Sequence, residues 1–297
     1  MTSAMSKKRL GLALVLISGV VFGTMPYLVT SCYEQGANAV LMLLARFVSL
    51  AIVVLPWALK GGGLLRAFRG NWKTLLRLSV AEGLTPLLLY TAYSHMATGL
   101  ATTAHFLYPM VVALWCVLGY REKLSRGKLL CLILCIAGVA LTVDLQGGRI
   151  SLLGISLSLL SSVTYAAYIV WMGKSEMHQI NPFQIAFFVG VGCGLLALVY
   201  GAVAGDLAAA ANVTPRGWLS MAAAGAAIAV GGSLLAIFGI RYTDAQTAAI
   251  ASTLEPLTSI VIGVAFLGET LGLAAAIGCG LILLAAVLLP TLGAREE

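Results

Sequence analysis

Four polar residues lie within long apolar stretches of this sequence. They are Arg46, Glu82, His105 and Glu255, and each is flanked on both sides mainly by apolar residues. A charged or polar side chain surrounded by apolar sequence is costly unless it pairs with another group or faces a water-filled or solute-filled space. These residues therefore predict a buried polar site, in which protein groups pair with one another or a solute binds.

Each of these residues has two readings. Arg46 could pair with a carboxylate of the protein or contact a solute. Glu82 could bind an amine or carry a proton, and Glu255 could hold a structural hydrogen bond or face the solute. His105 is the group that would titrate near neutral pH, or else a hydrogen-bonding residue of the core.

Aromatic residues accompany these polar groups at helical spacing. One stripe of the segment 73–94 contains Glu82, Thr85, Pro86, Leu89, Tyr90 and Tyr93, which follow the spacing of a single helix face. Other segments place Tyr108, Tyr165, Tyr168 and Trp171 at similar depth. Tyrosine and tryptophan also form belts at membrane interfaces, but the deeper tyrosines predict a cavity with aromatic walls.

The chemistry of such a cavity narrows the class of solute. A phosphate is costly to dehydrate without several fixed cations, and Arg46 is the one arginine or lysine inside an apolar segment. Aromatic walls favour a net-neutral solute with an apolar or aromatic part. An amino acid fits, because it needs one donor group, one acceptor group and a pocket for its side chain.

The elements that must position these residues are membrane helices. Of 297 residues, 60% are hydrophobic and 10% are charged, with a mean hydropathy of +1.00; a soluble domain carries about 25% charged residues. Apolar runs near 20 residues predict an all-α integral membrane protein with ten transmembrane helices. The predicted spans are 10–31, 38–59, 73–94, 98–120, 127–145, 152–172, 182–204, 217–240, 245–267 and 271–290.

The distribution of basic residues predicts the orientation. Of the 18 Lys and Arg residues, fifteen fall on one side of the ten spans, Arg149 and Arg216 on the other, and Arg46 within a span. The positive-inside rule therefore places both the N-terminus and the C-terminus in the cytoplasm. Basic residues beside an anionic leaflet also explain the net charge of +7 without nucleic acid as a partner.

The two halves of the chain are similar to each other. Leu10 to Gly23 matches Leu153 to Ala166, and Ala104 to Pro109 matches Ala251 to Pro256. The repeats, 10–145 and 152–290, each hold five predicted spans, so the second enters the membrane from the opposite side. Inverted repeats of this kind occur in secondary transporters, with the substrate between the halves. Pro109 and Pro256 occupy matching positions and are predicted hinges.

These features resemble the EamA branch of the drug/metabolite transporter superfamily. The resemblance rests on the five-plus-five repeat, on Leu254-Glu255-Pro256 with Leu267-Gly268-Glu269-Thr270-Leu271, and on the matching Tyr108-Pro109 with Arg121-Glu122-Lys123-Leu124. It covers nearly the whole chain and implies alternating access. The first copy departs from the pattern, with Tyr108 where the second has Glu255, so the halves need not contribute equivalent chemistry.

Within that branch the predicted cavity is most similar to the aromatic amino acid exporters. The resemblance implies an exporter of aromatic or large apolar amino acids in the bacterial inner membrane. A carrier of another metabolite, such as threonine or a purine, is the alternative. Export rather than import is implied by the resemblance alone, and the sequence is compatible with proton-coupled or facilitated flux and with a monomer or a dimer.

No pattern for catalysis or a bound cofactor stands out. Cys131 and Cys135 share a helix face but have no His or carboxylate nearby in sequence to complete a metal site. Glycine-rich phosphate loops are absent, and the short loops leave no room for a nucleotide-binding domain. We therefore expect no enzyme activity, no metal and no cofactor; the partners are a small-molecule substrate and the lipid bilayer.

Overall fold

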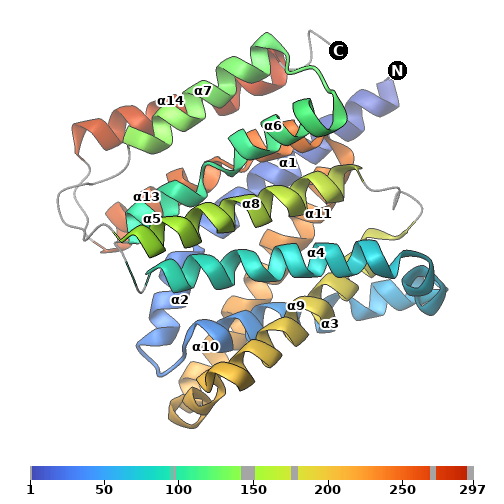
Figure 1. The fold of residues 1–297 in the computed structure, drawn as a ribbon, viewed down its shortest axis with the longest axis vertical. Helices are drawn as coiled ribbons and strands as arrows, with labels where there is room; N and C mark the ends of the chain where they lie inside the picture. Colours follow the sequence, from blue (N-terminus) through green and yellow to red (C-terminus); the bar gives the residue numbers. More distant parts are fainter. Residues whose placement is uncertain are drawn as a thin grey trace.

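In the computed structural model, helices that run roughly alongside one another make up the described part of the chain (Figure 1). The structure describes residues 2–93, 95, 98–141, 151–174, 180–267 and 272–292. No β-strand occurs within these residues. The observation agrees with the all-helical class predicted from the continuous apolar runs.

The helices of the first half follow the predicted spans, with two of those spans interrupted. They are α1 (Thr2–Gly23), α2 (Met25–Tyr33), α3 (Ala39–Lys60), α4 (Leu64–Tyr93), α5 (Thr98–His105), α6 (Tyr108–Tyr120) and α7 (Arg126–Leu141). The first predicted span is thus split into α1 and α2, and the fourth into α5 and α6. Helix α4 starts nine residues before the expected position 73, so it carries several basic residues ahead of its apolar part.

The second half has the same order with more irregular segments. Its elements are α8 (Leu152–Lys174), α9 (Pro182–Ala204), the 3-10 helix η2 (Asp206–Asn212), α10 (Pro215–Ala227), the π-helix η3 (Ile228–Leu234), α11 (Leu235–Tyr242), α12 (Ala245–Ala251), α13 (Leu254–Leu267) and α14 (Leu273–Leu292). The predicted eighth span therefore contains a π-helical segment, and the ninth is split into α12 and α13. Both kinds of interruption fall where the two halves meet.

Five helical stretches are long and apolar enough to cross a membrane. They are Ser6–Tyr33, Ala39–Lys60, Leu152–Lys174, Pro182–Ala204 and Pro215–Tyr242. Large apolar side chains also face outward, as shown by Leu118, which is 76% exposed, and Val203, which is 85% exposed. These features are those of an integral membrane protein, while the number of ten spans and their orientation stay predictions.

The two halves pack through pairs of helices that are equivalent under the sequence repeat. Helix α3 packs against α9, and α7 packs against α14, and in each pair the two helices occupy matching positions of the two halves. Contacts between α4 and α8 have their counterpart in contacts between α1 and α11. A twofold relation between the halves would produce this pattern.

The bend in the first predicted span lies against the second half. Helix α1 ends at Gly23, where a Cβ atom would lie 2.6 Å from the Glu255 carbonyl oxygen and 2.4 Å from Cβ of Thr258. Ser259 also donates a hydrogen bond of 2.9 Å to the Gly23 carbonyl. At Gly19, one turn earlier, the closest atoms to a Cβ would be 3.5 Å away. The backbone approach therefore needs glycine at position 23 and not at 19.

These distances predict different effects of two matched substitutions. We expect Gly23→Ala to lower the free energy of unfolding by about 1–3 kcal/mol, because the added methyl group overlaps backbone of α13. Gly19→Ala should be neutral or slightly stabilising, because it makes ordinary contacts and alanine favours the helix. Melting temperatures of the purified proteins in detergent test this, and equal stability of the two variants would contradict the packing.

Candidate functional site

A buried ion pair lies at the centre of the helix bundle. Helix α3 carries Arg46 and helix α4 carries Glu82, with 2.8 Å between Nη2 of Arg46 and Oε1 of Glu82. Arg46 also donates a hydrogen bond of 3.1 Å to Oγ of Ser233, which lies in the π-helix η3 of the other half. Both charged side chains are less than a tenth exposed. The pair therefore connects the two halves at a depth that water does not reach freely.

The remaining surface of the Arg46 guanidinium faces aromatic rings. Its central carbon lies 5.0 Å from the centre of the Phe22 ring and 4.9 Å from that of Phe47. Rings at this distance attract a cation through their negative faces. Phe22 and Phe47 therefore help to offset the cost of burying the charge, although neither offers a hydrogen bond.

Both members of the ion pair keep an unused hydrogen-bonding atom. Nε of Arg46 and Oε2 of Glu82 are buried and have no hydrogen-bond partner. A buried donor or acceptor without a partner costs about 1–3 kcal/mol, and more when it is charged. Each of these atoms therefore calls for a partner that the protein does not supply, such as water or a bound group.

A second carboxylate lies close to the pair. Glu255 is in the first turn of α13, is half-buried, and interacts electrostatically with both Arg46 and Glu82. One guanidinium, paired with Glu82, thus lies near two carboxylates, which leaves the centre one formal negative charge when all three groups are ionised. The excess carboxylate suits an ammonium group or a proton.

Three of the predicted tyrosines and His105 form one cluster beside these charges. The ring of Tyr165 lies 4.7 Å from that of Tyr108, 5.7 Å from His105 and 6.2 Å from Tyr168, measured between ring centres. Tyr165 and Tyr168 also lie near Glu82. The structure therefore brings the predicted aromatic wall and the predicted charges together.

Hydrogen bonds hold this cluster between α4, α5 and α8. Nδ1 of His105 and Oγ of Ser161 are 2.9 Å apart, and the Ser161 hydroxyl is also 2.9 Å from the Thr85 carbonyl oxygen, to which it can donate. His105 is therefore a hydrogen-bonding residue of the core, one of its two expected readings. The Tyr108 hydroxyl lies near Ser252 but makes no hydrogen bond of good geometry.

Two helix interruptions flank the cluster at matching positions. Helix α5 ends at His105 and α6 begins at Tyr108, while α12 ends at Ala251 and α13 begins at Leu254. Pro109 and Pro256 lie in the first turn after each interruption, where the missing N–H costs little. In place of kinks at the prolines themselves, the helices break two to four residues before them.

Three predicted site residues lie away from the central cluster. Tyr90 lines a separate hollow near the end of α4 and its hydroxyl contacts the sulfur of Met25 at 3.6 Å. Trp171 packs against Trp115, with 5.9 Å between ring centres. Tyr93 ends α4, and its side chain, like Gly268 to Leu271 of the family motif, lies outside the described residues. Helical spacing predicts which face of a helix a residue occupies, but Tyr90 and Trp171 lie further along their helix axes than the central cluster.

Two ion pairs lie at the end of the bundle where α6 and α7 meet. Nζ of Lys128 lies 3.0 Å from Oδ1 of Asp244, and Lys174 pairs with Glu122. Each pair joins one half to the other. Burial raises the pKa of an aspartate, but Lys128 and the hydrogen bonds from Thr247 outweigh burial and hold the pKa of Asp244 below its ordinary value of 3.8. The Asp244 carboxylate is therefore ionised at neutral pH.

Some residues of the site were missed by sequence reasoning. Ser233 follows Gly231 and Gly232 in an otherwise apolar segment, and its polar side chain in that segment was the only feature of the sequence that could have indicated it. Phe22 and Phe47 look like ordinary lipid-facing residues in the sequence. Their role depends on the position of the guanidinium, which only the packing determines.

The shared guanidinium predicts an asymmetry between two substitutions. Arg46→Met leaves Glu82 and Glu255 without a counter-charge, so we expect a loss of about 3–5 kcal/mol in the free energy of unfolding at neutral pH. Glu82→Gln should cost less, because Glu255 remains nearby as a counter-charge for Arg46. Thermal unfolding in detergent measures both, with Arg77→Met at an exposed position of α4 as a control. A smaller loss for Arg46→Met than for Glu82→Gln would contradict the arrangement.

Comparison with known proteins identifies the family. The profile of the EamA-like transporter family matches residues 9–144 and again 152–291. The chain is similar to the uncharacterized transporter YcbK of Bacillus subtilis (strain 168), with 28% identity over 91% of this chain and 89% of the relative. An uncharacterized transporter of Archaeoglobus fulgidus is also 28% identical, over 95% and 96% of the two chains.

A solved crystal structure has the same fold. It covers 97% of this chain and 98% of its own, with a TM-score of 0.77 at 16% identity. The family and both relatives are transporters, which argues against an enzyme. The chain belongs to the EamA-like transporter family and is an integral membrane transporter.

Proposed function

We propose that this chain exports aromatic or large apolar amino acids across the bacterial inner membrane by alternating access. The observation that carries the proposal is the pair of unpartnered atoms, Nε of Arg46 and Oε2 of Glu82, beside a cluster of tyrosines. An amino acid has a carboxylate for the first atom, an ammonium for the second and a side chain for the aromatic rings. Each part of the solute would then meet a group of suitable chemistry.

Specificity for an aromatic side chain would come from the tyrosine cluster. The rings of Tyr108 and Tyr165 meet nearly edge to face, at 80°, and a solute ring can add a further contact of the same kind. The unpartnered Tyr108 hydroxyl would orient the solute through one hydrogen bond. Glu255 would supply a second acceptor for the ammonium group, since such a group can donate three hydrogen bonds.

The arrangement of the halves supports alternating access. Equivalent helices pack in pairs, ion pairs close one end of the bundle, and a hollow of about 500 Å³ lies at the α2–α3 link. In the proposed inverted repeat with cytoplasmic termini, the closed end faces the cytoplasm and the hollow faces outward. The two halves would then rock about the central site.

Uptake into proteoliposomes tests the substrate class. We expect saturable flux of labelled Phe or Trp, and a KM about two- to tenfold higher in Tyr165→Ala, because one aromatic contact contributes about 0.5–1.5 kcal/mol. Tyr27→Ala, at an exposed position of α2, is the matched control and should leave KM unchanged. Flux of Thr or a purine, without flux of Phe or Trp, would agree with a transporter but refute the proposal that its substrates are aromatic amino acids.

The paired helix breaks predict an effect on rate. Alanine at 109 or 256 restores the N–H that a continuous helix needs, so the combined Pro109→Ala and Pro256→Ala variant should stiffen both breaks and lower the maximal transport rate several-fold. Pro215→Ala is the control, because Pro215 also begins a helix but is exposed at the start of α10. An unchanged rate in the folded double variant would refute the hinges.

A further inference from the structure

The hollow near the end of α4 has a lining unlike that of the central cluster. It is enclosed by the α2–α3 link, α4, the end of α9 and the start of η2, and measures about 500 Å³. Its lining residues are Tyr33, Ala37, Asn38, Ala39, Val40, Leu87, Tyr90, Thr91, Tyr200 and Asp206. No lysine or arginine is among them, so the hollow suits neither a phosphate nor a carboxylate.

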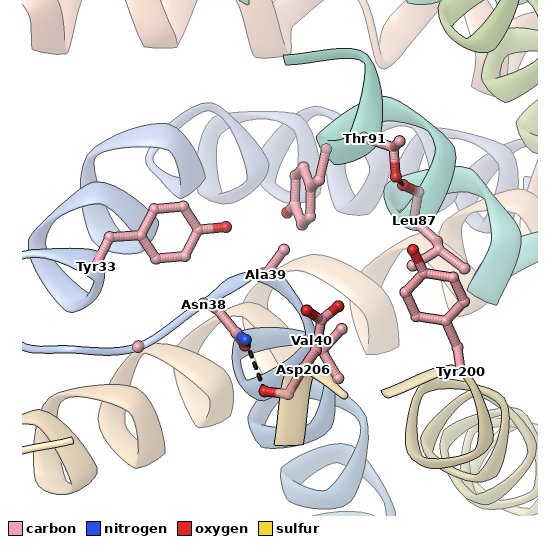
Figure 2. Close-up of a pocket in the computed structure, with 10 residues that line it drawn as sticks. Tyr33, Asn38, Ala39, Val40, Leu87, Thr91, Tyr200 and Asp206 are labelled. Carbon is pink, nitrogen blue, oxygen red and sulfur yellow. Dashed lines mark hydrogen bonds between the residues drawn. The ribbon is translucent and has the colours of Figure 1, made fainter. Parts of the chain in front are cut away.

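One carboxylate points into this hollow. Figure 2 shows the Asp206 side chain directed between Tyr33 and Tyr200. The Asp206 backbone carbonyl accepts a hydrogen bond of 2.8 Å from Nδ2 of Asn38, and Asn38 itself caps the start of α3. Asp206 is therefore held in place by its backbone, which leaves its carboxylate directed at the space. Within the part of the chain that the structure describes, no cation pairs with this carboxylate.

Aromatic side chains surround the carboxylate. Tyr33 and Tyr200 direct their hydroxyl groups toward the hollow in Figure 2, and Tyr90 completes the lining from α4. Tyrosine rings attract cations at their faces, and their hydroxyl oxygens accept hydrogen bonds from ammonium groups. Leu87 and Val40 add apolar surface. This lining is complementary to an ammonium group with an apolar substituent, because it combines three tyrosines, one half-buried carboxylate and the apolar surface of Leu87 and Val40.

The hollow is separated from the central site along one helix. Tyr90 lies eight residues after Glu82 on α4, which corresponds to about 12 Å at the rise of an α-helix. A solute at Arg46 and Glu82 therefore cannot contact Asp206 at the same time unless it is longer than an amino acid. The hollow is a second location on the same side of α4, with its own acidic group.

We propose that the hollow is a separate binding site for the ammonium group of an organic solute, with Asp206 as its counter-charge and Tyr33, Tyr90 and Tyr200 as its walls. The role of this site in transport rests on the proposed function, because an exported amino acid would pass the hollow between the central site and the outside. Ammonium binding itself does not depend on the identity of the transported substrate. It can therefore be tested without transport.

Thiol labelling in the purified protein tests the site directly. Ala39→Cys places a thiol in the lining, and Cys279→Ala removes the one native cysteine that is not buried. We compare the labelling rates of a cationic and an anionic methanethiosulfonate reagent of similar size. Asp206→Asn should lower the ratio of cationic to anionic rates about tenfold or more, because a charged cleft concentrates counter-ions by this factor. Glu34→Gln, an exposed acid beside Tyr33 outside the lining, is the matched control and should leave the ratio nearly unchanged.

Protection from labelling identifies the ligand class. Phenethylammonium should slow labelling of the introduced thiol in a saturable manner, 3-phenylpropionate should not, and Asp206→Asn should abolish the protection. Any of three results would overturn the proposal. These are equal protection by both compounds, protection that survives Asp206→Asn, and a ratio of cationic to anionic labelling rates that Asp206→Asn does not change. Failure of Phe and Trp uptake with ammonium protection intact would refute the proposed substrate and leave the site standing.

Discussion

The buried contact between Arg46 and Glu82 is the interaction on which the rest of the structure depends. An arginine at this depth in a membrane protein requires a counter-charge, and the contact at 2.8 Å supplies it. It brings α3 and α4 of the first half together with η3 and α13 of the second, through Ser233 and the nearby Glu255. The same contact leaves one donor atom and one acceptor atom without a partner, and these two atoms are the groups that the proposed zwitterionic solute would bind.

The helices around this centre combine close packing with interruptions of the helical backbone. Gly23 lets α1 approach the backbone of α13, and Gly190 lets α9 approach the backbone of α3 in the same way. The breaks between α5 and α6 and between α12 and α13 interrupt two helices beside the site. Ion pairs between the halves occur at one end and a hollow at the other. Close packing at the centre, ion pairs at one end and a hollow at the other are compatible with the proposed rocking motion about the centre.

Much of this arrangement could be predicted from the sequence, because lipid imposes strong rules on composition. The apolar runs indicated the helices, and the isolated charges indicated that Arg46, Glu82 and Glu255 need partners within the bundle, while their role in solute binding stays a prediction. The tyrosine spacing on 152–172 correctly grouped Tyr165 and Tyr168 with Tyr108. Tyr90 was placed with them wrongly in height, because periodicity gives the face of a helix and not its shift along the axis. Two further features could not be predicted from the sequence. The position of Ser233 in a π-helix depends on the packing of neighbouring helices, and the start of α4 at Leu64 lies beyond the apolar segment, where water surrounds the helix.

The central claim is that a solute binds between Arg46, Glu82 and the tyrosine cluster. Crystals grown with 4-bromophenylalanine and measured at the bromine absorption edge would locate the ring of the solute directly. The account predicts an anomalous peak beside Tyr108 and Tyr165, with the amino acid backbone extending toward Nε of Arg46. A peak at another position, with the Arg46 and Glu82 contact unchanged and no solute beside it, would contradict the account.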